Sequence, residues 1–223
     1  MPIRKTPLVT NHIYHIFNRG INRAPIFLDK RDYQRFIDII DYCRFSDYPV
    51  KFSSFRSLKP QIKEEIKSTL KNKSVSFVAY CLMPNHFHFI LRQEEDNGIS
   101  SFMNRFLTSY TKFFNTKHKR TGPLFENRFK SVLVETDEQI KHLSRYIHLN
   151  PYSSGIIKDL KKLEQYTWSS LAEYLNSENE SNICDLKQIV LSNFRNIEKF
   201  REFTFNHAEY QKKLEKIKHL LVQ

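Results

Sequence analysis

The spacing of apolar residues along the chain alternates between short β-prone runs and longer stretches with helical periodicity. Runs rich in β-branched and aromatic residues predict strands. Longer stretches place apolar residues three and four apart, as at Phe102, Phe106 and Tyr110, and predict amphipathic helices. The predicted strands cover 12–17, 75–83, 86–91 and 128–134, and the predicted helices cover 30–43, 99–114 and 137–149.

The order of these elements is strand, helix, strand, strand, helix, strand, helix. Turn residues Pro84 and Asn85 join two of the strands as a hairpin. This mixture predicts an α+β fold with an antiparallel sheet and helices on one face. Pro151 is expected to end the last of these helices.

The remaining segments suggest a catalytic domain with additions. Residues 46–73 are polar and rich in lysine, so they read as an insertion with a short helix near 60–70. Residues 152–176 look irregular, and the chain beyond them has helical patterning. We therefore predict a domain over 1–176 and a helical C-terminal extension over 177–223, whose role the sequence leaves open.

Charge points to a polyanionic partner. Among 223 residues, 36 Lys and Arg face 24 Asp and Glu, which gives a net charge of +12. Such an excess is typical of nucleic-acid binders, although a merely basic protein is the plain alternative. No apolar run approaches the ~20 residues of a membrane span, and the N-terminus lacks the apolar region of a signal peptide. Three separated cysteines fit a reducing compartment, so we expect a cytoplasmic protein without membrane contact.

Two histidines form the sharpest chemical feature. His86 and His88 lie two residues apart on a predicted strand, so both side chains face the same side. Two neutral imidazoles can begin a divalent metal site, but a further ligand must come from elsewhere. The plain alternative is a half-exposed strand that happens to carry two histidines.

A second pair lies on the last predicted helix of the domain. Tyr146 and Asn150 are four residues apart and share one helix face. The tyrosine can act as a nucleophile, and the amide can bind a metal or a phosphate. Tyr146 also falls on the apolar stripe, so a role in the core is the alternative. Tyr110 is a rival nucleophile, but its neighbours favour a structural role.

Basic residues accompany these pairs and are candidate phosphate contacts. They follow the first strand, fill the loop before Thr121 and alternate along the fourth strand, where Phe125 and Phe129 add rings for base stacking. For any one of them a solvated surface charge is the simpler interpretation. The set is Arg19, Arg23, Lys117, Lys119, Arg120, Arg128 and Lys130.

These residues carry a family resemblance. PNHFHFIL at 84–91 resembles the HUH motif, His-hydrophobe-His, of the single-tyrosine transposases. RTGPLFENRFKS at 120–131, followed by RYIHLNPYSSG at 145–155, resembles the REP-associated tyrosine transposases, in which Asn follows the tyrosine by four residues. The resemblance extends from about residue 12 to about residue 174. The insertion-sequence branch of the family has Gln where Asn150 stands.

The resemblance implies a ferredoxin-like fold and a DNA-cutting activity. Such enzymes cleave single-stranded DNA beside a hairpin with Mg²⁺ or Mn²⁺, and they form a 5′-phosphotyrosine and a free 3′-OH. Carried over, His86, His88 and Asn150 would be metal ligands and Tyr146 the nucleophile. Hairpins of the REP type would be the DNA partner, and a homodimer stays open.

Two other functions remain open from the sequence. A DNA-binding protein without catalysis would also use a basic, aromatic-rich surface. A replication-initiator or relaxase nuclease would share the chemistry but act on plasmid origins. The joint presence of the histidine pair and the tyrosine–asparagine pair weighs against a pure binder, which needs neither.

Overall fold

In residues 7–176 and 183–221, which the computed structural model describes, four strands form one antiparallel sheet. The sheet order is β2-β3-β1-β4, so the second and third strands in the chain are neighbours, as the hairpin prediction requires. The predicted α+β order of strands and helices is confirmed. The strands are β1 Ile13–Arg19, β2 Val75–Met83, β3 His86–Gln93 and β4 Lys130–Val134.

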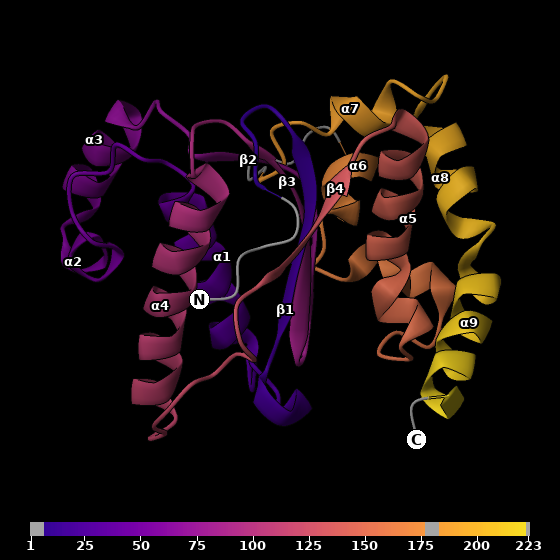
Figure 1. The fold of residues 1–223 in the computed structure, drawn as a ribbon, viewed down its shortest axis with the longest axis horizontal. Helices are drawn as coiled ribbons and strands as arrows, with labels where there is room; N and C mark the ends of the chain where they lie inside the picture. The colour runs from indigo at the N-terminus through magenta and orange to yellow at the C-terminus, as the bar shows by residue number, and fades with distance from the viewer. Residues whose placement is uncertain (1–6, 177–182, 222–223) are drawn as a thin grey trace. The chain divides into compact units, whose positions relative to one another are not determined.

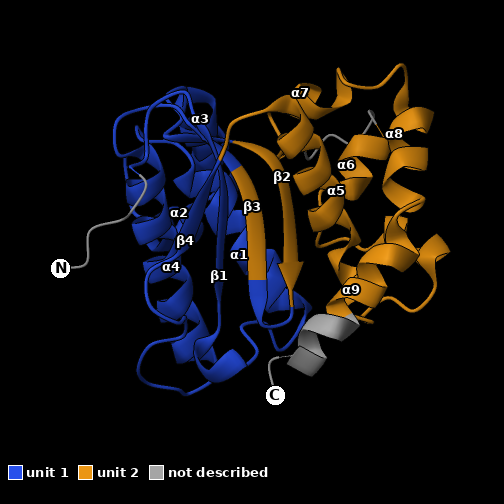
Figure 2. Ribbon diagram, turned by 45° about the vertical axis from the view of Figure 1, so that its right-hand side comes forward, with its two compact units in different colours: residues 1–76, 84–86, 91–133 blue, residues 77–83, 87–90, 134–223 orange. Residues whose placement is uncertain are grey.

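The chain groups into two compact units, coloured in Figure 2. The first comprises residues 1–76, 84–86 and 91–133, and the second comprises 77–83, 87–90 and 134–223. The domain boundary predicted at residue 176 is not a boundary between these units, because residues 134–176 group with the C-terminal helices. A domain boundary there stays a prediction from the sequence. No helix among the described residues is long and apolar enough to cross a membrane.

The first unit is built on two long helices that pack side by side (Figure 1). Phe36 is fully buried, and its ring meets Phe106 edge-on with centroids 4.5 Å apart and Tyr110 at 4.7 Å. These residues lie on the apolar stripes that predicted the helices, so hydrophobic periodicity accounts for the packing. The helices of this unit are α1 Lys30–Cys43, α2 Phe52–Ser57, α3 Pro60–Thr69 and α4 Gly98–Lys117, and a single 3-10 turn, η1, covers Ile21–Arg23.

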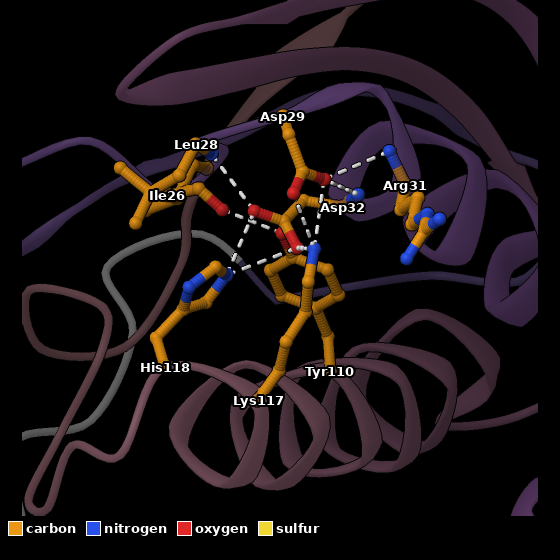
Figure 3. A network of polar contacts seen from close by, with 8 residues as sticks. All are labelled: Ile26, Leu28, Asp29, Arg31, Asp32, Tyr110, Lys117 and His118. Atoms are coloured by element: carbon orange, nitrogen blue, oxygen red, sulfur yellow. Dashed lines mark hydrogen bonds and ion pairs between the residues drawn. The ribbon is translucent and has the colours of Figure 1, made fainter.

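A buried carboxylate joins the start of α1 to the end of α4 (Figure 3). Asp29 caps α1 by accepting hydrogen bonds from the backbone of Arg31 and Asp32. Asp32 is fully buried, and its carboxylate receives the ammonium of Lys117 at 2.7 Å and Nε2 of His118 at 3.0 Å. A buried charge needs such partners, because burial strips it of water. Lys117 also holds the pKa of Asp29 below its usual value through a side-chain hydrogen bond.

We expect Lys117→Met to lower the free energy of unfolding by about 2 kcal/mol. The change leaves the carboxylate of Asp32 buried with a weaker set of donors, and the partial exposure of the lysine moderates the cost. Urea denaturation monitored by circular dichroism measures this change. Lys119→Met, on the exposed loop beyond α4, is the matched control and is expected to change stability by less than about 0.5 kcal/mol. Equal stabilities of the two variants would contradict the role of the network.

The insertion contains two helices, whereas the sequence predicted one. The prediction near 60–70 corresponds to α3, and α2 was missed because six residues are too few to show a period. Phe52 and Phe55 of α2 are buried, and the ring of Phe55 stacks on Tyr42 of α1 with centroids 4.4 Å apart. The insertion therefore belongs to the core of the first unit at its α2 end.

The second unit is dominated by α5 Asp137–Ser153, against which α7, α8 and α9 pack (Figure 1). Thr136 is its N-cap, and its side chain accepts a hydrogen bond from the backbone of Gln139. The predicted end before Pro151 is wrong, because the helix continues to Ser153 with the proline inside it. A proline removes one backbone donor, and so close to the end of the helix this interrupts little. The other helices are η2 Leu160–Gln165, α6 Leu171–Leu175, α7 Gln188–Leu191, α8 Ile197–Phe205 and α9 Ala208–Leu221.

The segment predicted as an irregular tail instead follows the edge strand of the sheet. Leu82 donates its backbone N–H to Trp168 at 2.8 Å, and Ser170 donates to Tyr80 at 3.0 Å. All nine residues of β2 are buried, so neither side of this strand faces water. The segment supplies hydrogen bonds that a bare edge strand would lack, a demand that residue periodicity does not reveal.

Candidate active site

The two histidines lie at the start of β3, on one side of the strand. His86 is half-buried and His88 is 8% exposed. Phe87 and Phe89 point to the other side, where both are fully buried and their rings stack with centroids 4.5 Å apart. The apolar alternate positions therefore fix which way both imidazoles face.

Asn85 orients the first imidazole. Its Nδ2 donates to the carbonyl of Arg23 at 3.0 Å, which leaves its Oδ1 facing Nδ1 of His86 at 2.7 Å. An amide oxygen only accepts, so Nδ1 of His86 carries a proton, and in the neutral imidazole the lone pair is then on Nε2. This is the tautomer that an imidazole needs in order to bind a metal through Nε2, with a neighbour holding the other nitrogen.

The turn after β1 holds Asn85 in place. Gly20 donates its backbone N–H to the carbonyl of Asn85 at 2.8 Å. A Cβ at Gly20 would lie 2.1 Å from the carbonyl oxygen of Ala24, so only glycine fits this close approach. Arg23, whose carbonyl binds the amide of Asn85, adopts a positive φ of 58° in the same turn.

We expect Asn85→Leu to weaken Mn²⁺ binding about 10- to 100-fold, because the imidazole of His86 loses the acceptor that fixes its tautomer. Asn85→Asp keeps an acceptor at this position and should bind Mn²⁺ about as well as the natural protein. Isothermal titration with Mn²⁺ distinguishes the two variants. Equal weakening by both substitutions would show that the turn, and not the acceptor, matters.

Helix α5 brings the second pair to His88. The ring of Tyr146 meets the imidazole of His88 edge-on, with centroids 5.9 Å apart and planes at 86°. Asn150 lies one turn further along the same face and is 5% exposed. Its Nδ2 is buried without a hydrogen-bond partner, which is costly unless a bound group supplies one. Tyr146 thus lies beside the second histidine, and Asn150 follows one turn later on the same helix.

The C-terminal helix supports the backbone of this tyrosine. Gln211 of α9 is 7% exposed, and its Nε2 donates to the carbonyl of Tyr146 at 3.0 Å and to Oγ of Ser153 at 3.3 Å. Tyr152 of α5 donates a hydrogen bond to Glu209 of α9. The C-terminal extension therefore helps to hold the helix that carries the candidate nucleophile.

We expect Gln211→Leu to lower the free energy of unfolding by about 2 kcal/mol, because it removes two hydrogen bonds that contribute about 1 kcal/mol each. The rate of covalent adduct formation should fall several-fold, because Tyr146 is less firmly oriented, while the affinity for hairpin DNA stays unchanged. Lys213→Leu, at an exposed position on the same helix, is the control. If Gln211→Leu is less stable but forms the covalent adduct as fast as the natural protein, Gln211 has a structural role only.

The rival tyrosine, Tyr110, and a further histidine, His148, are buried in the core. Tyr110 is fully buried, and its hydroxyl donates to the carbonyl of Ile26 at 2.5 Å, while burial raises the pKa of the phenol. His148 on α5 is also fully buried, with Nε2 2.8 Å from Oγ of Ser170, and burial lowers its pKa to about 3. Neither group is placed to meet a substrate, whereas Tyr146 is half-buried and its ring lies against His88.

The donor set fits a divalent metal. Among the described residues, no group of three or more His, Cys, Asp and Glu side chains is placed to hold an ion. His86 and His88 carry imidazole nitrogens and Asn150 carries an amide oxygen, and these are donor types that a divalent metal accepts beside oxygens from outside the protein. Imidazole and oxygen donors suit Mg²⁺ and Mn²⁺ less tightly than a carboxylate cage, so we expect weak binding that substrate phosphate strengthens.

Comparison with known proteins identifies the family. The profile of the family "Transposase IS200 like" matches residues 8–150, which include the histidine pair and the tyrosine–asparagine pair. The chain belongs to the IS200-like transposases. This confirms the resemblance based on PNHFHFIL and RYIHLNP.

Two individual proteins similar to this IS200-like chain are both named as REP-associated tyrosine transposases. A Haemophilus influenzae protein named as a REP-associated tyrosine transposase is 22% identical over 112 residues, which cover 45% of this chain and 63% of that protein. A solved structure of a REP-associated tyrosine transposase bound to a REP hairpin is 17% identical, with a TM-score of 0.55. The superposition covers 82% of this chain and 90% of the chain in that structure, and it confirms the fold.

The basic residues predicted to bind DNA have different surroundings in this IS200-like chain. Nε of Arg19 pairs with Glu126 at 2.6 Å, and Lys117 pairs with Asp29 and Asp32. Arg120 donates to Asn115 and to the carbonyl of Pro123, which closes its own loop. Those three therefore have partners within the protein, and Arg19 is exposed none the less, as are Arg23, Lys119, Arg128 and Lys130. Their contact with DNA remains a prediction.

Two residues of the site escaped sequence reasoning. Asn85 was read only as turn chemistry, although its position directly before the histidine pair was a usable signal. Gln211 lies 65 residues after Tyr146 and carries no motif, so only the fold reveals it.

Proposed function

We propose that this chain is a metal-dependent single-stranded DNA endonuclease and strand transferase that acts beside hairpins. The observation that carries the proposal is the ring of Tyr146 against the imidazole of His88, 5.9 Å apart between centroids. Membership of the IS200-like transposases supports the same chemistry. The REP hairpin held by the structural neighbour supports a hairpin as the DNA partner.

In the proposed reaction, Oη of Tyr146 attacks the scissile phosphorus. A bond forms between Oη and phosphorus, and the bond to the 3′ oxygen breaks. The phenol gives its proton to solvent, and the leaving 3′ oxygen takes up a proton to become a 3′-OH. The product is a 5′-phosphotyrosine, which keeps the energy of the phosphodiester, so attack by another 3′-OH can rejoin the strand.

The side chains divide the work. His86 and His88 would hold Mg²⁺ or Mn²⁺, and the ion would stabilise negative charge on the phosphate in the transition state. Asn150 would offer its amide oxygen to the ion, and its buried Nδ2, which has no hydrogen-bond partner, would donate to a phosphate or water oxygen. Asn85 fixes the tautomer of His86, and Gln211 fixes the helix of Tyr146.

A nicking assay tests the proposal. The full chain is mixed with a hairpin oligonucleotide taken from beside its own gene and labelled at both its 5′ and 3′ ends, with unpaired flanks and Mn²⁺, and the products are resolved on a denaturing gel. A shortened labelled strand together with a protein–DNA adduct is expected. Tight binding of the hairpin with no cleavage, unaffected by EDTA, would contradict the proposal and indicate a binding protein without catalysis.

A further inference from the structure

A cavity of about 710 Å³ lies within the first unit, lined by α1, α4 and the start of the insertion. This volume is within the usual range of ligand pockets, about 300–1,000 Å³. Tyr48, Lys51 and Phe52 come from the insertion, so the cavity depends on the segment whose role the sequence left open. We call this cavity, between α1, α4 and α2, the insertion groove.

The insertion groove combines positive charge with aromatic rings. Its lining includes Arg35, Lys51, Arg105, Lys112 and Lys117, and no Asp or Glu is among the lining residues. Tyr48, Phe52 and Phe113 supply rings. An anionic ligand with a flat apolar part matches this lining, because the cations would bind its charge and the rings would contact its flat part. A purely apolar ligand would gain nothing from the cations.

Not every cation of the groove is available to a ligand. Nη2 of Arg105 donates to the backbone carbonyls of Cys43 and Phe45, so this side chain builds the wall. Lys117 is paired with Asp29 and Asp32. Lys51 and Lys112 are exposed, and they are the groove lysines that can turn toward a bound phosphate.

Arg35 makes a flat surface inside the groove. Its guanidinium lies 4.4 Å from the centroid of Phe113 and 5.7 Å from that of Phe52. Unpaired bases stack on aromatic rings and on arginine planes, and such stacking contributes about 1–3 kcal/mol per base without demanding a sequence. Lys51 and Lys112 line the same groove, so they place positive charge near the sugar–phosphate backbone of a base stacked on Arg35.

We infer that the insertion groove binds an unpaired segment of the DNA substrate. A base would stack against the guanidinium of Arg35 and the ring of Phe113, and phosphates would lie at Lys51 and Lys112. The inference rests on the proposed function for its choice of DNA. In this inference the insertion adds a second DNA contact beside the hairpin contact, and the protein therefore favours substrates with a single-stranded extension.

The test compares binding of two DNA probes by the full chain. One probe is the hairpin with blunt ends, and the other carries an extension of about ten unpaired thymidines on its 5′ or its 3′ side. The groove variant is Lys51→Gln/Lys112→Gln. The control is Lys59→Gln/Lys71→Gln, which removes the same charge from exposed lysines of the same insertion that do not line the groove. Fluorescence anisotropy over a range of salt concentrations gives Kd and its salt dependence.

The groove variant is expected to bind the extended probe about 10-fold more weakly, with a salt slope smaller by about 1.4 for two lost contacts to a single strand. Its affinity for the blunt hairpin, and both affinities of the control, should stay unchanged. With 5-iododeoxyuridine in the extension, ultraviolet crosslinks should map to peptides containing Tyr48, Phe52 or Phe113. An extension that adds no affinity in the natural protein, or equal behaviour of the two double variants, would overturn the inference.

The failure of this inference can be told apart from failure of the proposed function. If the natural protein nicks the hairpin but the groove variant binds the extended probe as the control does, the groove is not a DNA site and the function stands. If nothing is nicked but the groove variant loses affinity for the extension, the groove stands as part of a protein that only binds DNA.

Discussion

Tyr146→Phe should abolish the covalent protein–DNA adduct and lower the rate of hairpin nicking about 10⁴-fold or more. The substitution removes the single oxygen that forms the bond to phosphorus and leaves the ring that packs against His88. The affinity for the hairpin and the melting temperature should stay close to those of the natural protein, because the ring fills the same space. Single-turnover nicking and anisotropy with the same hairpin measure both quantities.

Tyr110→Phe is the matched control for this experiment. It removes a hydroxyl that is bonded to the carbonyl of Ile26 in the core of the first unit. We expect it to cost stability, about 1–2 kcal/mol from the lost buried bond, and to keep the adduct. An adduct that survives in Tyr146→Phe and disappears in Tyr110→Phe would contradict the assignment of the nucleophile.

His88→Ala should lower nicking about 10³-fold and make it require far more Mn²⁺. It removes one of the two imidazoles of the proposed metal site and the ring that Tyr146 packs against. Charge stabilisation by a metal at the scissile phosphate is worth several kcal/mol, and 10³-fold corresponds to about 4 kcal/mol. EDTA should have at least as large an effect on the natural protein, and added Mn²⁺ should restore its activity fully.

His12→Ala is the control for the histidine variant, because His12 is exposed and lies before β1, outside the site. It should nick DNA as the natural protein does, at every Mn²⁺ concentration. Nicking by His88→Ala with an unchanged Mn²⁺ requirement, or full activity of the natural protein in EDTA, would contradict a metal held by this histidine pair.

Local patterns in the sequence were sufficient to predict most of the fold. The helices predicted over 30–43, 99–114 and 137–149 correspond to α1, α4 and α5, because the spacing of apolar residues is a local property of the chain. The end of α5 at Pro151 was mispredicted, since a proline in a final turn costs little. The segment after α5 was read as irregular because its hydrogen bonds go to β2, far away in the chain.

The candidate site was predictable where its geometry is local. Two histidines on one strand, and a tyrosine and an asparagine one helical turn apart, follow from the periods of strand and helix. The meeting of Tyr146 with His88 is a tertiary contact between residues 58 positions apart, and the family resemblance suggested it where periodicity could not. Which lysines and arginines have acidic partners was likewise invisible, since Lys117 is paired with carboxylates more than 80 residues earlier.

The most direct measurement is the identity of the residue joined to DNA. The full chain is reacted with the hairpin and Mn²⁺, digested with protease and nuclease, and the peptide carrying a nucleotide is sequenced by mass spectrometry. The account predicts a 5′-phosphate ester on Tyr146, in the peptide that contains YIHLNP. A nucleotide on Tyr110 or any other residue, or a linkage to a 3′-phosphate, would contradict it.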